Sequence, residues 1–363
     1  MKKVFIMAGE PSGDETGAWY IAQERKQELK KEYTAIGGSQ LEAAGAKIYR
    51  SIDGLAISGA WEIVKHIPKM LKLMYSIVRH VRDEVYDEVV LIDYPGFNLW
   101  LMRLISFWCP KVAIIYVAPP QMWVWGAGRT RVLKKLAKKV IVLYPFERDW
   151  FKERGVTVEW WGTPLLEKVS YEPIKERKKH IALLLGSRTQ EIVGLSKYFV
   201  PAITRLLQRH PEYSVSVVVA AHTSTDELVA HLHAHGAKEW KQGYAIVTDA
   251  KEKAAVMRSA VCALTKPGTN TLELALMGTP AVVAYKTSWM TYWLARSVIK
   301  LNSITLPNIF LKDNVYPELI QFNCTPSDIA YELNRIVDMH EKHSHRYEAL
   351  VKRILCVREL LAQ

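Results

Sequence analysis

The segment Lys266–Tyr285 combines backbone and side-chain groups whose spacing suits a phosphorylated ligand. It reads KPGTNTLELALMGTPAVVAY, which predicts the end of a strand, a glycine turn and the start of a helix. The first turn of that helix offers hydrogen-bond donors to a phosphate or a ribose, from Gly268, Thr269, Asn270 and Thr271. Glu273, on the same helix, can accept hydrogen bonds from sugar hydroxyls. The pattern indicates a nucleotide-sugar pocket, although many glycine turns before helices bind nothing.

Two carboxylates stand at predicted strand ends in the first half of the chain, where a general base would lie. Asp93 ends the apolar run VVLID before a rigid turn, so partial burial would tune its pKa for proton abstraction. Glu10 follows the first apolar run, in AGEPSGD. The alternative for Asp93 is a helix or turn cap, and Ser12 or Asp14 can cap the helix after the first strand. We favour a catalytic base at Asp93.

A third strand end carries an arginine. The apolar run Ile181–Leu185 leads into Gly186, Ser187 and Arg188, and a helical pattern follows. An arginine there can donate two hydrogen bonds to a diphosphate, and the helix start adds backbone donors. The alternative is an exposed surface arginine. An expected position opposite the Gly268 turn favours the anion-binding interpretation.

These residues must be positioned by alternating strands and helices. Apolar runs predict strands at 4–8, 89–93, 112–117, 140–144, 181–185, 214–221, 244–247, 261–264 and 281–284. Longer helical patterns separate them, which predicts βαβ units, parallel sheets and an α/β fold. The charged segment 168–180 is the expected linker. We therefore expect two doubly wound, Rossmann-like domains facing a central cleft, with ligands at the carboxyl ends of the strands.

Composition limits the class of protein. The chain has 363 residues, of which 49% are hydrophobic, and a formal net charge of +12, which attracts phosphate-bearing partners. Its four cysteines show no CxxC pairing, which favours a reducing compartment and argues against a zinc ribbon. The triplet of histidines at 231, 233 and 235 lacks ligand partners at a suitable spacing, so we expect no metal. No apolar run is long enough to span a membrane.

The order of short motifs along the chain resembles the lipid-A-disaccharide synthase family, inverting glycosyltransferases of the two-domain GT-B type. The motifs are AGEPSGD, LAISGAWEIV, IDYPGFN, YVAPPQMWVW, LYPFE, GTPLLE, LLLGSRTQEI, KPGTNTLELALMGTPAVVAYK, YWLAR, LPNIF and PELIQ. They run nearly end to end and in register. Each motif alone is weak, but together they are specific.

The resemblance implies a reaction and roles for particular residues. The family joins UDP-2,3-diacylglucosamine to 2,3-diacylglucosamine 1-phosphate, giving a β-1,6-linked disaccharide and UDP, generally without a catalytic metal or a cofactor. Asp93 and Glu10 match its catalytic carboxylates. The positions that match its UDP-sugar side are Gly186, Ser187, Arg188, Gly268, Thr269, Asn270, Glu273 and Gln321.

The resemblance also implies an organisation. We expect an acceptor-binding, membrane-associated domain over 1–170, joined by the tail 340–363, and a UDP-sugar-binding domain over 171–339. We expect a cytoplasmic protein at the inner face of the inner membrane, and leave a homodimer open. Departures from the family pattern, which bear on substrate detail, are Gly96, Gly126, Thr163, Leu185 and Pro267.

The segment Trp61–Val85 is the candidate for contact with an anionic membrane. One stripe is apolar and comprises Ile63, Val64, Ile67, Met70, Leu71, Met74, Ile77, Val78 and Val81. The other is mainly basic and comprises Lys65, Lys69, Lys72, Ser76 and Arg79. For the apolar stripe we favour packing on the protein's own sheet. The basic stripe can attract anionic headgroups. The aromatic segment Ser288–Lys300 is left open between acyl or membrane contact and domain packing.

Three other functions compete. A catalytically silent binding protein would retain the same pocket, but the intact Asp93 and Arg188 argue against it. A nucleotide-sugar epimerase would use the same diphosphate pocket and would need no acceptor. Nucleic-acid binding fits the basic charge, but we find no recognition helix and no RNP-like strand and expect no such partner. Acceptor dependence separates the transferase from the epimerase.

Overall fold

The computed structural model describes residues 1–27, 30–52, 60–174, 176–186, 189–220, 223–298 and 303–362. Contacts between residues divide the chain into two compact units, Met1–Pro164 and Leu165–Gln363. Ser187 and Arg188 lie outside the described residues, and so do the side chains of Ile63, Val64, Lys65 and Met290.

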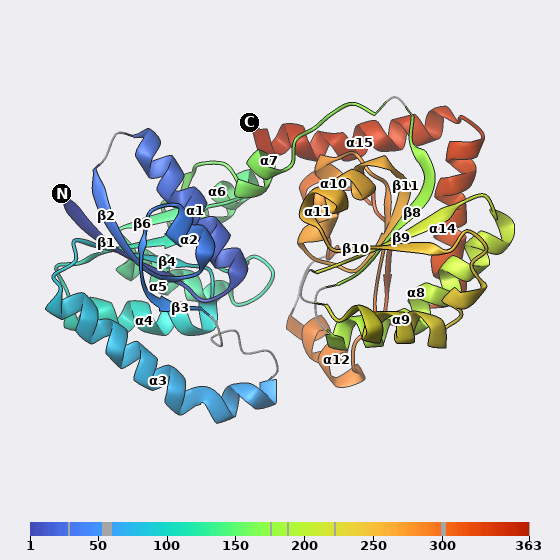
Figure 1. Cartoon of the computed structure of the whole chain (residues 1–363). Coiled ribbons are helices and arrows are strands. Elements are labelled where there is room, and N and C mark those ends of the chain that lie inside the picture. The colour runs from blue at the N-terminus through green and yellow to red at the C-terminus, as the bar shows by residue number, and fades with distance from the viewer. Residues whose placement is uncertain are drawn as a thin grey trace. The chain divides into compact units, whose positions relative to one another are not determined.

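The first unit is a seven-stranded sheet with order β3-β2-β1-β4-β5-β6-β7 (Figure 1). Every strand pairing recorded in it is parallel. Its strands are β1 (Lys2–Ala8), β2 (Lys31–Gly37), β3 (Lys47–Ser51), β4 (Glu88–Ile92), β5 (Ala113–Val117), β6 (Lys139–Val142) and β7 (Glu159–Trp160). Its helices are α1 (Pro11–Lys26), α2 (Ser39–Ala43), α3 (Ala60–Asp83), α4 (Pro95–Trp108), η1 (Ala127–Arg129), α5 (Thr130–Leu136) and α6 (Pro145–Lys152). The helix α7 (Pro164–Lys168) begins at the boundary.

The second unit is a six-stranded sheet with order β10-β9-β8-β11-β12-β13, again with parallel pairings. Its strands are β8 (Lys178–Gly186), β9 (Ser214–Val219), β10 (Tyr244–Val247), β11 (Ala260–Thr265), β12 (Ala281–Tyr285) and β13 (Glu318–Ile320). Its helices are α8 (Thr189–Arg209), α9 (Thr225–Ala234), η2 (Ala237–Glu239), α10 (Ala250–Ser259), α11 (Thr269–Leu276), α12 (Trp289–Val298), α13 (Leu306–Leu311), α14 (Pro326–Glu341) and α15 (His345–Ala362).

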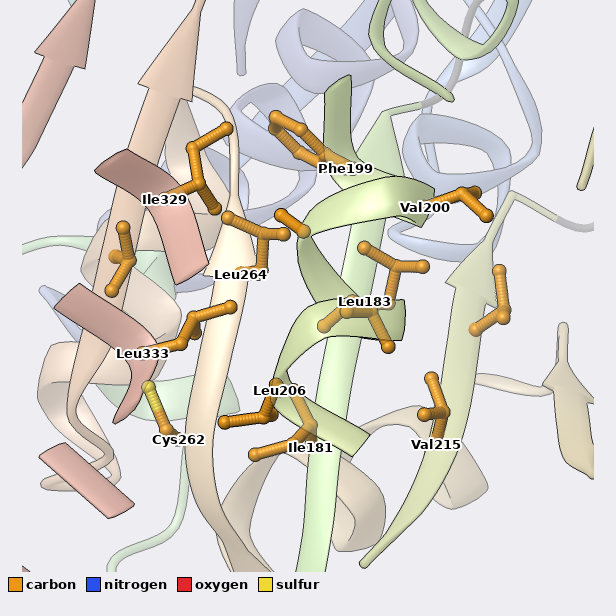
Figure 2. Close-up of a cluster of buried hydrophobic side chains, with 14 of the residues drawn as sticks. Ile181, Leu183, Phe199, Val200, Leu206, Val215, Cys262, Leu264, Ile329 and Leu333 are labelled. Carbon is orange, nitrogen blue, oxygen red and sulfur yellow. The ribbon is translucent and has the colours of Figure 1, made fainter. Parts of the chain in front are cut away.

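Each unit is held together by a core of its own. In the second unit α8 lies across β8 and packs beside α14, so that Leu183, Leu264, Phe199 and Leu333 meet in one buried cluster (Figure 2). The first unit has buried clusters on both faces of its sheet. Central parallel strands covered by helices on both sides must be apolar on both faces, which is why they appear in the sequence as continuous apolar runs. The α/β fold with two parallel sheets is confirmed.

The tail packs within the second unit. Helix α15 contacts α11, α13 and α14, and the Arg358 guanidinium donates to the Val169 carbonyl. The expected domain boundary near 170 and the joining of 340–363 to the first domain stay predictions.

Helix α3 has both buried and exposed apolar side chains. Met74, Ile77, Val78 and Val81 of the expected apolar stripe are buried in the core, and so is Leu73. Ile67 and Leu71 of the same stripe are exposed, so only part of the stripe packs on the sheet. Pro68 lies inside the helix. No helix in the described part of the chain has the length and apolarity needed to cross a bilayer.

Candidate functional site

The first cluster of expected site residues lies at the carboxyl edge of the seven-stranded sheet. Strands β1 and β4 are neighbours, with Ala8 opposite Ile92. Glu10 and Asp93 therefore leave the sheet side by side. In parallel α/β sheets this edge is where ligands bind.

Asp93 has an unusual backbone that the surrounding residues hold in place. Its φ is 43° and that of Tyr94 is 46°, a left-handed conformation that costs a non-glycine residue about 1 kcal/mol. The buried Asn98 amide donates to the carbonyls of Ile92 and Asp93, both at 3.0 Å. The Tyr116 hydroxyl donates to the Asp93 carbonyl at 2.7 Å. These bonds hold the backbone of Asp93 in place at the end of β4.

The pKa of Asp93 suits a general base. Burial, with the negative charge of Glu10 as a second cause, raises this pKa from 3.8 to about 6, and a backbone hydrogen bond from Tyr94 partly offsets the rise. A carboxylate with a pKa near 6 is still ionised at pH 7 and is a stronger base than an ordinary aspartate.

Glu10 occupies the N-cap position of α1. Its carbonyl accepts from the Asp14 amide at 3.0 Å, and its side chain makes no capping hydrogen bond among the described residues. Asp14 does cap a helix, but not the one expected from the sequence. Its carboxylate accepts from the amides of Gly38, Gln40 and Leu41, at the start of α2.

A buried glutamate that sequence reasoning missed lies in the first turn of α6, the helix after β6. Glu147 accepts from the Trp123 indole at 3.0 Å and from the Tyr144 amide at 3.1 Å. Complete burial raises its pKa from 4.5 to about 7, and these hydrogen bonds oppose the rise. The bond to Trp123 ties the loop after β5 to the start of α6. Because LYPFE reads as an ordinary helix start, the sequence gives no sign that Glu147 is buried.

Arg129 belongs to the same loop region. Its guanidinium stacks 3.7 Å from the centre of the Trp125 ring. A Cβ added at Gly126 would lie 2.5 Å from Arg129 Nε, so the guanidinium fills the space that a side chain at 126 would take.

The second cluster lies at the carboxyl edge of the six-stranded sheet. Gly186 ends β8 with φ 112°, and Gly268 follows β11 with φ 145°. Strands β8 and β11 are neighbours, with Leu184 opposite Thr265. The two glycine turns therefore leave adjacent strands at the same edge.

The first turn of α11 is organised by a lysine from α10. Lys253 Nζ lies 3.1 Å from Glu273 Oε2 and 3.1 Å from Asn270 Oδ1. Thr269 is exposed. The Thr271 hydroxyl donates to the Gly268 carbonyl at 2.7 Å, so this side chain closes the turn.

Gln321 follows β13, the neighbour of β12. Its side-chain amide accepts from the Thr287 amide at 3.2 Å and donates to the Thr287 carbonyl at 3.1 Å. Both ends of the amide are thus used to join the exits of β12 and β13. The structure therefore shows Gln321 holding the Thr287 backbone at the carboxyl edge of the sheet.

Comparisons with known proteins agree with this arrangement. The profile of the lipid-A-disaccharide synthetase family matches residues 4–359. The chain is 32% identical to the lipid-A-disaccharide synthase of Granulibacter bethesdensis, over 92% of this chain and 86% of that one. It is 30% identical to the enzyme of Trichlorobacter lovleyi, over 99% and 93%.

Solved structures share the fold at low identity. The UDP co-structure of S. aureus MnaA superposes with a TM-score of 0.65 at 12% identity, over 99% of this chain and 94% of that one. Acinetobacter baumannii MurG gives 0.60 at 16%, over 99% and 95%. These likenesses establish a GT-B-type fold. The family match over almost the whole chain goes further: this protein belongs to the lipid-A-disaccharide synthetase family, glycosyltransferases of lipid A biosynthesis.

Proposed function

We propose that the chain transfers 2,3-diacylglucosamine from UDP to the 6-hydroxyl of 2,3-diacylglucosamine 1-phosphate. The products are a β-1,6-linked disaccharide 1-phosphate and UDP. The observation that carries this proposal is the half-buried Asp93, with its pKa near 6 beside Glu10, on a chain that matches the family from residue 4 to 359.

The chemistry is one in-line displacement. Asp93 takes the proton of the acceptor hydroxyl as the oxygen bonds to C1 of the donor sugar. The C1–O bond breaks with its electron pair going to the diphosphate, so UDP leaves and the configuration at C1 inverts. Burial, with the charge of Glu10 as a second cause, keeps the pKa of Asp93 high.

The donor would be held at the edge of the second unit. Gly268, Thr269 and Asn270 present the first turn of α11 to the nucleotide, and Glu273 accepts from hydroxyl groups. Gly186, Gln321 and the undescribed Ser187 and Arg188 complete the proposed set. Arg129, with its guanidinium held over Gly126, is a candidate for the acceptor phosphate.

We also propose that the enzyme works as a peripheral protein on the cytoplasmic face of the inner membrane. Support comes from an apolar surface on α3 and α4, which lie side by side (Figure 1). We call this the α3–α4 surface; its exposed apolar members are Ile67, Leu71, Tyr75, Trp100, Phe107 and Trp108. Lys69, Lys72 and Arg79 on α3 would meet anionic headgroups.

The decisive experiment measures UDP release by the purified protein with and without the acceptor, and identifies the sugar product by mass spectrometry. We expect disaccharide only when both substrates are present, and a loss of at least about 100-fold in Asp93→Asn. The exposed Asp149→Asn is the matched control and should keep full activity. Conversion of the UDP-sugar without acceptor would instead identify an epimerase.

A further inference from the structure

Lys266 occupies the space between the two glycine turns of the second unit. A Cβ added at Gly186 would lie 2.8 Å from Lys266 Cε, and one added at Gly268 would lie 3.8 Å from Lys266 Nζ. At Gly186 a side chain would also clash with Glu191 Oε2, so glycine there leaves room for both Lys266 and Glu191, whereas Gly268 is only in ordinary contact distance of the ammonium. Turns of this kind let backbone amides approach an anion closely.

A carboxylate from the first turn of α8 holds that ammonium. Lys266 Nζ lies 3.2 Å from Glu191 Oε1, with the two side chains only 20% and 16% exposed. Nζ also lies 3.4 Å from the Pro267 carbonyl. The ammonium is thus fixed at the strand edge by one carboxylate.

Within the part of the chain that the structure describes, this ion pair leaves one carboxylate oxygen unpaired. Glu191 Oε2 is buried and has no hydrogen-bond partner among the described residues. A partly buried pair with an unsatisfied oxygen incurs a desolvation cost without full compensation, so it contributes little to stability. An arrangement that stabilises the fold poorly is better explained by a ligand that replaces one partner.

We propose that Lys266 binds the diphosphate of the nucleotide donor and that Glu191 is its resting counter-ion, a positioning residue. This inference rests on the proposed function, because it assumes that a nucleotide diphosphate occupies the edge of the second unit. When the diphosphate arrives, the ammonium exchanges Glu191 Oε1 for phosphate oxygens. As the C1–O bond breaks, its electron pair passes to the diphosphate, and the lysine charge stabilises that developing charge without transferring a proton.

The rival explanation is that the ion pair only stabilises the packing of α8 against the end of β11. The two explanations predict opposite effects of the variant Glu191→Gln on the affinity for UDP. If the pair only stabilises this packing, Glu191→Gln would loosen the pocket and weaken every ligand. As a counter-ion, the carboxylate competes with the diphosphate for Lys266 and repels it, so the same variant would bind UDP more tightly.

The test is calorimetric binding of UDP and of uridine to the full-length protein at fixed ionic strength. For Lys266→Met we expect UDP affinity to fall by about tenfold or more and uridine affinity to stay unchanged. Lys266→Arg should restore most of the UDP affinity, and Glu191→Gln should raise it several-fold. Lys179→Met is the matched control, because Lys179 also pairs with a glutamate, Glu341, at 2.9 Å but lies at the start of β8.

Each other result has one meaning. Equal losses of UDP and uridine affinity in Lys266→Met, or no loss at all, would overturn the inference. Weaker UDP binding by Glu191→Gln would overturn the role given to Glu191. A wild-type protein that binds no UDP would refute the proposed donor and the inference with it. If the variants behave as expected but no disaccharide forms, the inference stands and the proposed reaction fails.

Discussion

At the scale of single residues, the proposed proton transfer depends on the charge around Asp93. The base must be ionised, so its raised pKa places the loss of activity near neutral pH. We expect kcat/KM to be constant above pH 7 and to fall as the pH drops through about 6, the pKa of Asp93. The measurement is the rate of UDP release as a function of pH at low substrate concentration.

The variant Glu10→Gln tests the cause of that pKa. Removing the negative charge of Glu10 lowers the pKa of Asp93, since like charges disfavour ionisation. The acidic limb of the profile should move to lower pH. Asp87→Asn is a suitable control because the Asp87 carboxylate is exposed and accepts only the Lys3 amide in the described structure. A limb that stays in place would remove Glu10 from the electrostatics of the base.

Sequence reasoning at this scale succeeded where the residue stands at a strand end. The positions of Asp93 and of Gly268 were predictable because an apolar run shows where the strand stops. The hydrogen bonds of Asn98 and Tyr116 to the Asp93 carbonyl were not, since they join separate elements through the three-dimensional fold. The catalytic and binding roles themselves stay predictions.

At the scale of elements, Glu147 joins the loop after β5 to the start of α6 through one buried carboxyl group. Its folded pKa, about 7, lies above the ordinary 4.5, so folding favours the protonated form. The associated stability is fully present below pH 4.5 and is lost as the pH rises through about 7.

We therefore expect Glu147→Gln to be less destabilised relative to wild type at pH 8 than at pH 5. The change between the two pH values should be on the order of 2 kcal/mol. Urea unfolding of both proteins at the two pH values gives this difference directly. A constant difference would mean that Glu147 ionises normally in the folded protein.

The α3–α4 surface gives a second prediction at this scale. Replacing Leu71 and Tyr75 with serine removes two side chains that are 59% and 70% exposed, so the fold should lose little stability. We expect the double variant to sediment less with vesicles containing anionic lipid and to bind UDP as well as wild type.

The matched control is Tyr331→Ser on α14 of the second unit, where the side chain is 67% exposed. It should sediment like wild type. If it reduced vesicle binding as much as the double variant does, the α3–α4 surface would have no special role.

Element prediction depended on how apolar each strand is. The nine strands expected from apolar runs are present, with ends that differ by up to three residues. Four others, β2, β3, β7 and β13, were missed because they are short or interrupted by charged residues. Edge strands such as β3 need only one buried face and leave a weak pattern.

At the scale of the whole molecule, the two separate cores predict that the two units unfold in separate transitions. Each unit has its own buried clusters, and the proposed nucleotide site lies entirely in the second. Scanning calorimetry should resolve two unfolding transitions. UDP should raise the midpoint temperature of only one of them. At a ligand concentration of 100 times Kd the stabilisation is about 2.7 kcal/mol.

Lys266→Met should reduce the shift that UDP produces and leave the other transition unchanged. A single transition that moves as one with UDP would show instead that the two units unfold together. The fold class of the molecule was predictable because alternating strands and helices leave few solutions. The partner of Lys266 was not, because Glu191 lies on α8, a distant segment of the chain.

The buried carboxylate of Asp14 has a consequence for the order in which this chain folds. It sits in the first turn of α1, yet its hydrogen-bond donors lie 24, 26 and 27 residues further along the chain. Helix α1 can form early, but it cannot be buried without an unpaired charge until β2 and α2 have arrived. The segment that carries Glu10 should therefore reach its final position only when the next βα unit docks.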